Sequence, residues 1–96
     1  MLKLLRVSGQ SLWPLYEDGD YVLVAPPRLA GGIRPGDTLV FQHAAFGVMI
    51  KRVERIIPES GDIFVVGAHE RSVDSRQFGA IRRASVLGKV IWHIKR

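Results

Sequence analysis

Short apolar runs, each preceded by a Gly-Asp pair, set the pattern of hydrophobic and polar positions along the chain. The pairs stand at residues 19–20, 36–37 and 61–62, directly before the runs YVLV, TLVF and IFVV. Glycine supplies the positive φ that tight turns need, and an Asp side chain can hydrogen-bond the backbone of the same turn. The β-branched and aromatic residues that follow favour strands. The pattern therefore predicts three turns that each lead into a strand.

The remaining apolar segments also have the composition of strands, and no long segment shows the apolar period of a helix. The stretch 25–35 is rich in Pro and Gly and predicts a loop. The polar stretch 67–80 leaves room for a single helical turn at 72–76. Short strands at this spacing predict a mainly β fold, an antiparallel barrel or sandwich, with residues 1–96 as a single domain. The further strands are predicted at 4–7, 46–57 and 86–94.

Composition and charge narrow the classes of function. The chain has 96 residues and a net charge of +5, and the second half (51–96) carries ten Lys/Arg against five Asp/Glu. Such a basic half can bind nucleic acid, an anionic membrane or an acidic protein, or can be a solvated surface. The absence of cysteine excludes disulfides, thiolate zinc sites and cysteine nucleophiles. The N-terminal stretch MLKLLRV is too short for a signal peptide or a membrane-spanning helix. We therefore expect a cytoplasmic location, with any membrane contact made at the membrane surface.

A lysine inside a predicted strand is the most informative charge. Side chains alternate along a strand, so in VMIKRVERII Lys51 shares its face with Met49 and Val53. A lysine in this position either extends its amine to water or stays buried, and burial lowers its pKa. A neutral amine can act as a general base. The strand pattern alone favours the side chain that reaches water.

Ser11 and three histidines are the other candidates for chemistry. Ser11 stands in the stretch SGQSLWPL, which lacks the G-x-S-x-G elbow of many hydrolases, and a serine in a turn is ordinary by itself. His43 falls in a predicted hairpin loop and His93 in an apolar strand, so we keep only His69, in the polar loop, as a site candidate. No two histidines have the spacing of metal ligands. No glycine-rich loop precedes a helix, as a phosphate site would require.

Three segments, in this order and at this spacing, resemble the type I signal peptidases. SGQSLWPL resembles their S-G-x-S-M-x-P-T-L box, and IKRVERI resembles their lysine box. VVGAHERSVDSRQFG resembles the box G-D-N-x-x-x-S-x-D-S-R-x-F/Y-G. The resemblance covers residues 7–81, and the small relatives without a membrane anchor, such as the maturation protease of nickel-type superoxide dismutase, are most similar in length. The self-cleaving repressors related to LexA share the Ser/Lys chemistry but lack the S-x-D-S-R box.

The resemblance implies a serine peptidase with a Ser/Lys dyad on a β fold of the signal peptidase and LexA type. Ser11 matches the nucleophile and Lys51 the general base that takes its proton. Ser72 matches a serine that orients the lysine, and Asp74 and Arg76 match a pair that supports this loop. The backbone N–H of Ser11 would contribute to the oxyanion hole. The resemblance implies no cofactor and no metal.

The same resemblance implies a protein substrate that binds as an extended strand beside the dyad. The expected reaction is the endoproteolytic removal of an N-terminal leader or propeptide from a partner protein, and no nucleic acid is expected. Leu12 replaces the usual methionine with an apolar side chain of similar volume. The residues expected to contact substrate are Gly9, Leu12, Trp13, Pro14 and Met49.

Two alternatives stay open. One is a β-barrel binding module without enzymatic activity, which would hold nucleic acid or an acidic protein through a contiguous basic face and lose affinity in salt. The other is a degenerate, inactive family member, which the triplet Gly67-Ala68-His69 suggests because it stands in place of G-D-N. We prefer the enzyme because Ser11 and Lys51 are both present. The candidates for a basic face are Arg52, Arg55, Arg82, Arg83, Lys95 and Arg96.

Overall fold

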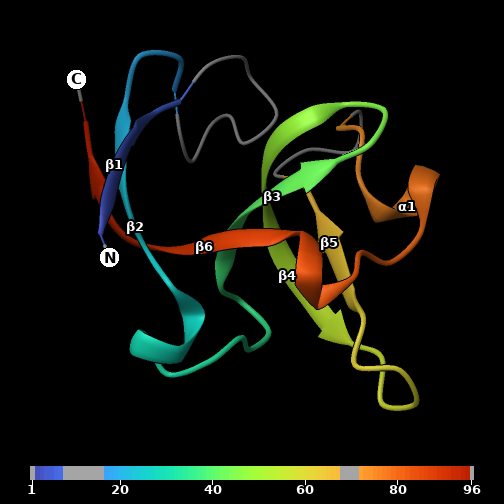
Figure 1. Cartoon of the computed structure of the whole chain (residues 1–96). Coiled ribbons are helices and arrows are strands. Elements are labelled where there is room, and N and C mark those ends of the chain that lie inside the picture. Colours follow the sequence, from blue (N-terminus) through green and yellow to red (C-terminus); the bar gives the residue numbers. More distant parts are fainter. Residues whose placement is uncertain (1, 8–16, 68–71, 96) are drawn as a thin grey trace.

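The protein folds into one six-stranded sheet in the order β1-β2-β6-β3-β4-β5, in which every neighbouring pair runs antiparallel (Figure 1). This computed structural model describes residues 2–7, 17–67 and 72–95. The expected fold class, mainly β with antiparallel strands, is confirmed. The strands are β1 (Lys3–Arg6), β2 (Tyr21–Ala25), β3 (Thr38–His43), β4 (Gly47–Ile56), β5 (Ile63–Val66) and β6 (Val86–Ile94), and the helical turns are η1 (Pro27–Leu29), α1 (Ser75–Phe78) and η2 (Arg83–Ser85).

The Gly-Asp pairs form the turns that the sequence predicts. Gly19, Gly36 and Gly61 have φ values of 94°, 93° and 76°, a backbone region that favours glycine. In the first two turns the Asp side chain accepts a backbone hydrogen bond, from Glu17 N to Asp20 and from Arg34 N to Asp37. The turn before β5 differs, because there the backbone N–H of Asp62 donates to the hydroxyl of Ser60.

The single helical turn of the polar stretch begins at Ser75, three residues later than predicted. Asp74 has an extended backbone and its carboxylate accepts a hydrogen bond from Arg76 N, while the Gln77 side chain accepts one from Asp74 N. This reciprocal capping satisfies backbone donors that the first turn leaves open, and it therefore decides where the turn starts. The turn ends at Gly79, whose φ is 82°.

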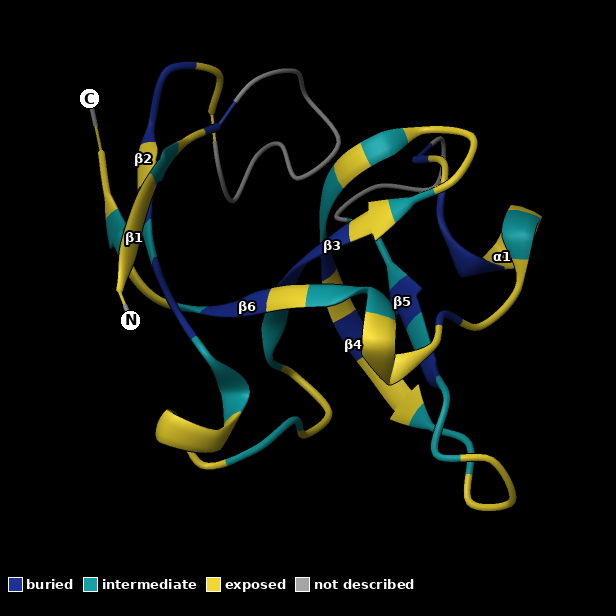
Figure 2. Cartoon of the chain, in the orientation of Figure 1, coloured by how far each residue is buried: buried dark blue, intermediate teal, exposed yellow. Residues whose placement is uncertain are grey.

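The sheet bends strongly, so that β1 and β2 lie at one side and β4, β5 and α1 at the other, with β6 running between them (Figure 1). The N-terminal part of β6 pairs with β3 and its C-terminal part with β2, and both pairings contain a register shift. Such bulges increase the local bend and twist of a strand. The bend gives the sheet two core clusters, one around Phe41 and Val53 and one around Val22 and Val40 (Figure 2).

The outer edge of β5 is covered by the segment that follows it. Ile63 and Ile81 exchange two backbone hydrogen bonds, each 2.8 Å long. Further along β5, the N–H of Val65 donates to the hydroxyl of Ser75 at 2.9 Å. Residues 72–81 therefore take up donors that an outer strand would otherwise expose, and they lie close to the face of β4 that carries Lys51.

Candidate active site

Lys51 lies in the middle of β4, opposite Leu39 of β3, on the face that carries the Phe41 cluster. Its side chain is buried, with 1% of the residue exposed. The solvent-directed side chain that the strand pattern favours is therefore wrong, because core residues and the segment after β5 cover this face. Within the described part of the chain, Lys51 Nζ has no hydrogen-bond partner. An amine in these surroundings has lost the water that stabilises its charged form.

The surroundings of Lys51 favour its neutral form. Burial lowers the pKa of Lys51 below its ordinary value of 10.5, and this is the largest effect. The charge of Asp74 raises the pKa and the charge of Arg76 lowers it. Because the two neighbouring charges act in opposite directions, desolvation decides the net direction, which is downward.

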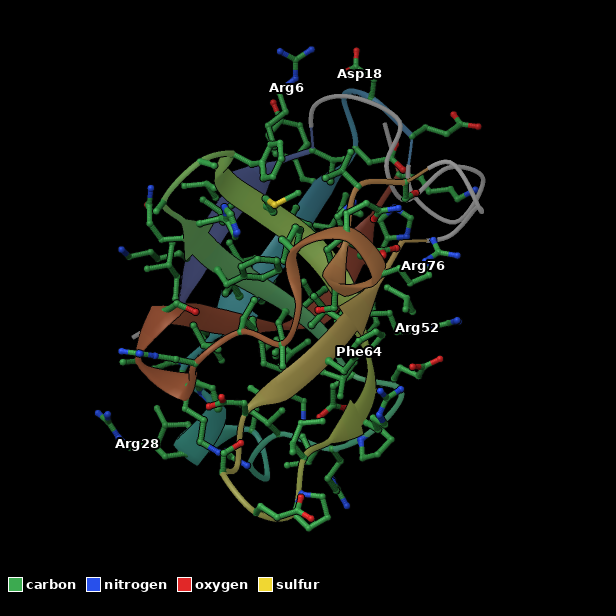
Figure 3. The ribbon with its side chains drawn as sticks, turned by 90° about the vertical axis from the view of Figure 1, so that its right-hand side faces the viewer. Arg6, Asp18, Arg28, Arg52, Phe64 and Arg76 are labelled. Atoms are coloured by element: carbon green, nitrogen blue, oxygen red, sulfur yellow. The ribbon has the colours of Figure 1, made fainter. Side chains whose placement is uncertain are left out.

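Asp74 is fully buried and connects Gly67, directly after β5, to Arg76 in α1. One carboxylate oxygen accepts hydrogen bonds from Arg76 N and Nε, at 3.0 and 2.9 Å. The other accepts from Arg76 Nη2 at 2.7 Å and from Gly67 N at 2.8 Å. Burial raises the pKa of Asp74, but the hydrogen bonds from Arg76 and Gly67 outweigh burial and lower it below its usual 3.8. The guanidinium of Arg76 extends to the outer surface beside α1 (Figure 3).

Two buried serines flank this carboxylate. Ser72 is 3% exposed and precedes Asp74 by two residues. Ser75, equally buried, accepts the hydrogen bond from Val65 N and so connects α1 to β5. The sequence patterns indicated Ser72 and not Ser75, because the partner of Ser75 is ten residues away on β5 and only the fold brings the two together.

The described structure leaves part of the β4 edge without a strand partner. β5 pairs with β4 only over residues 52–56, whereas β3 pairs with it over residues 47–52. Val53 N donates toward the β3 side, to Asp37 O. Because backbone groups alternate along an antiparallel strand, those of Val48 and Ile50 point to the side away from β3. Met49 lies between them and packs, half-buried, against the Phe41 cluster.

The predicted nucleophile and most predicted substrate contacts fall outside the described residues. These are Gly9, Ser11, Leu12, Trp13 and Pro14, together with the alternative base His69. The ends of the serine-bearing segment are described. Val7 N donates to Asp20 O at 2.7 Å, and Gly19 N donates to Val7 O at 2.8 Å. The residues on either side of the segment that carries Ser11, Val7 and Gly19, are therefore hydrogen-bonded to each other and lie side by side.

Two buried polar contacts join residues that lie far apart in the sequence, and no local pattern indicated them. Lys89 in β6 is 7% exposed, and its Nζ contacts Asp37 at 3.0 Å and donates to the carbonyl of Ala30 at 2.7 Å. His93 Nε2 lies 2.7 Å from the buried carboxylate of Asp20. His93 lies in the apolar strand predicted for it, and this contact gives it a polar partner. Unlike Lys51, Lys89 has several oxygens around its amine, which is the arrangement of a structural ion pair.

His43 belongs to an aromatic cluster at the hairpin between β3 and β4. Its ring stands 4.5 Å from that of Phe78 and 5.1 Å from that of Phe46. Its Nδ1 accepts a hydrogen bond from Ala45 N at 3.0 Å, so this last residue of β3 bonds the turn that follows it. A hollow of about 310 Å³ lies between this hairpin and the segment after α1.

Several arginines of the proposed basic face are engaged within the molecule. Arg55 contacts Glu54 at 2.6 Å and lies over the ring of Phe64, 4.0 Å from its centre. Arg83 Nε donates to the carbonyl of Gly61 at 3.0 Å. Figure 3 places Arg52, Phe64 and Arg76 on the side of the molecule that carries α1 and β5. The alternative of a contiguous basic face for nucleic acid or an acidic protein stays untested.

A family model described as Peptidase S24-like matches residues 1–91. The chain belongs to the peptidase S24-like family. This family is related to the signal peptidases but is not identical to them, so the expected peptidase relationship is confirmed only at this broader level. A search among curated proteins found no match.

Among residues 2–7, 17–67 and 72–95, no helix is long and apolar enough to cross a membrane. Within the same residues, no three His, Asp or Glu side chains gather closely enough to hold a metal ion.

Proposed function

We propose that this chain is a serine endopeptidase that uses Ser11 as nucleophile and Lys51 as general base to remove a leader or propeptide from a partner protein. Membership of the peptidase S24-like family supports the reaction class. The observation that carries the proposal is the buried Lys51 amine, which has no hydrogen-bond partner among the described residues. A structural lysine is buried with partners, as Lys89 is, whereas a base must be free to accept a proton.

The proposed reaction passes through an acyl-enzyme. The neutral Lys51 amine takes the proton of the Ser11 hydroxyl as its oxygen forms a bond to the scissile carbonyl carbon. The Ser11 backbone N–H stabilises the oxyanion. The Lys51 ammonium then returns the proton to the leaving amine as the peptide bond breaks. Water, deprotonated by the same amine, attacks the ester carbonyl; the Lys51 ammonium gives this proton to the Ser11 oxygen as the ester bond breaks, which releases the second product and restores both residues.

The charges of Asp74 and Arg76 adjust the pKa of the proposed base, Lys51. Asp74 and Arg76 have opposite effects on the pKa of Lys51, so their pairing limits the net effect of either charge. The buried Ser72 is proposed to orient the lysine, as the resemblance to signal peptidases implies. A positioning residue of this kind changes the pH profile and rate without contacting substrate.

The open part of the β4 edge is the proposed place for substrate. The backbone groups of Val48 and Ile50 would pair with an extended peptide, as in other cases of strand addition. The outer edge of β5 is a poorer site because residues 72–81 already cover it. Leader removal fits this mode, since unfolded termini reach such an edge without unfolding the mature protein.

The test is mass spectrometry of a mixed pool of leader-like and propeptide-like peptides incubated with the wild type, Ser11→Ala and Lys51→Met. Cleavage by the wild type alone, rising with pH as one amine loses its proton, is expected. Cleavage that survives in Lys51→Met overturns the lysine base and directs attention to His69. The absence of cleavage by the wild type, on peptides and on partner proteins alike, favours an inactive family member or a binding module.

A further inference from the structure

Asp20, in the turn before β2, is hydrogen-bonded to residues on both sides of the segment that carries Ser11. Its backbone carbonyl accepts a hydrogen bond from Val7 N at 2.7 Å, and its carboxylate accepts one from Glu17 N at 3.0 Å. Val7 and Glu17 are the described residues on either side of positions 8–16. Asp20 itself is 3% exposed. One buried residue therefore connects the two ends of the Ser11 segment.

His93 in β6 connects this residue to a neighbouring strand. Its Nε2 lies 2.7 Å from the Asp20 carboxylate, and only 21% of the His93 side chain and 4% of the Asp20 side chain are exposed. An ionised carboxylate can only accept a hydrogen bond, so Nε2 is the donor whether the imidazole ring is neutral or protonated. Hydrogen bonds to a charged group are stronger than those between neutral groups. The contact therefore fixes the Asp20 carboxylate against β6.

β6 is the strand that spans the two halves of the bent sheet. Its C-terminal part pairs with β2, where His93 lies opposite Val22, and its N-terminal part pairs with β3, which places Leu39 opposite Lys51. Figure 1 shows β6 running between these two sides of the molecule. Ser11 stands in the sequence between β1 and β2, on one side, and Lys51 lies on the other. A contact between the Asp20 turn and β6 therefore bears on how the two residues stand relative to each other.

A second turn makes the same kind of contact without adjoining Ser11. The carboxylate of Asp37 accepts a hydrogen bond from Arg34 N, and Lys89 of β6 contacts it at 3.0 Å. A basic side chain of β6 against a turn carboxylate is thus a structural feature of this fold, and its loss lowers stability in either place. The Asp20 turn differs because it ends the segment that carries Ser11, so its loss has a further effect on catalysis.

We propose that His93 and Asp20 are positioning residues, which set the place of the Ser11 hydroxyl relative to the Lys51 amine through the two ends of the Ser11 segment. This inference rests on the proposed function, because it takes Ser11 as the nucleophile. A nucleophile displaced by about 1 Å loses about a hundredfold in rate. Substrate binding is assigned to the β4 edge, so the loss falls on kcat and leaves KM unchanged.

The experiment measures kcat and KM of the full chain for a cleaved peptide in two variants of His93. His93→Phe keeps a ring of similar size without a donor and should lower kcat about tenfold or more at unchanged KM. His93→Gln keeps an N–H donor at a similar reach and should retain most of the wild-type kcat. The matched control is Val90→Ala, in the same strand and packed in the Val40 cluster. It should lower the melting temperature and leave kcat as in the wild type.

A second readout does not depend on activity. His93→Phe should speed hydrogen exchange of the Glu17 amide about tenfold, because the carboxylate that accepts from it is no longer fixed, whereas Val90→Ala should speed it less. Circular dichroism confirms that each variant is folded. Should His93→Phe not fold, Asp20→Asn takes its place, since it replaces the charged acceptor by a neutral one of the same shape and should also lower kcat at unchanged KM.

The possible failures are distinguishable. A wild type that cleaves no peptide overturns the proposed function and this inference together. An active wild type with an unchanged kcat in His93→Phe overturns this inference alone. So does a fall in kcat that is as large in His93→Gln or in Val90→Ala, because the lost donor is then not its cause.

Discussion

Replacing Lys51 by Met should make the protein more stable at neutral pH, although it removes the proposed base. Methionine is unbranched and of similar length, so it fills the same space against Met49 and Val53 without a buried amine. The native state of the wild type is destabilised relative to the unfolded chain, because burial makes the amine of Lys51 harder to protonate. Stability gained by removing a polar group from a functional site is a known trade-off.

The size of this effect follows from the pKa shift. Between the lowered pKa of Lys51 and its ordinary value of 10.5, the unfolded chain binds a proton that the native chain does not. Wild-type stability therefore rises with pH through this interval, by about 1.4 kcal/mol per pH unit. Lys51→Met lacks this dependence. The pH-dependent part of the stability gained by Lys51→Met is complete below the lowered pKa and disappears as the pH rises to 10.5.

The assay is urea unfolding followed by circular dichroism, from neutral pH to the ordinary lysine pKa. Lys89→Met is the matched control, because Lys89 is also a buried lysine but has Asp37 and two carbonyls around its amine. Breaking that contact should cost about 3 kcal/mol. A loss of stability in Lys51→Met comparable to that in Lys89→Met would refute the reasoning, as would an advantage that does not change with pH.

Four further changes test the surroundings of the site. Asp74→Asn removes a charge that raises the pKa of Lys51, so the pH–rate profile of peptide cleavage should move to lower pH. Arg76→Gln removes a charge that lowers this pKa and should move the profile to higher pH. Shifts of both variants in the same direction would contradict this. Asp74→Asn should also cost about 3 kcal/mol in urea unfolding at neutral pH, a difference that fades below pH 3.8 as the wild-type carboxylate protonates. Ser75→Ala should cost about 1–2 kcal/mol and speed hydrogen exchange at the β5 amide it accepts from; unchanged exchange would exclude its role. Gly88→Ala would push a Cβ into the Val24 side chain of β2 and should cost about 1–3 kcal/mol by thermal unfolding; an unchanged melting temperature would contradict this overpacking.

Much of the fold was predictable because each Gly-Asp pair favours a turn and the β-branched and aromatic residues after it favour a strand. The bounds of β5 and β6 match the predicted 63–66 and 86–94. The start of α1 was less predictable, since it depends on reciprocal hydrogen bonds between Asp74 and Gln77. The strong bend of the sheet depends on bulges, which no local pattern in the chain marked.

The state of each lysine could not be predicted from its strand. Lys51 and Lys89 both lie in apolar strands, but only the fold brings oxygens of a loop 57 and 59 residues away to Lys89. The same holds for His93, whose partner Asp20 is 73 residues distant. Alternation assigned Lys51 to the correct face, but only the fold packs that face with core residues from β3, β5 and α1 and leaves Lys51 buried.

The most direct test of the central claim is a side-chain NMR titration of Lys51 in the intact protein, with its signal assigned by its absence in Lys51→Met. A neutral general base predicts that this amine titrates clearly below 10.5 and that the midpoint coincides with the rise in peptide cleavage. A titration at or above 10.5 would contradict the account, because Lys51 would then stay charged wherever the enzyme works.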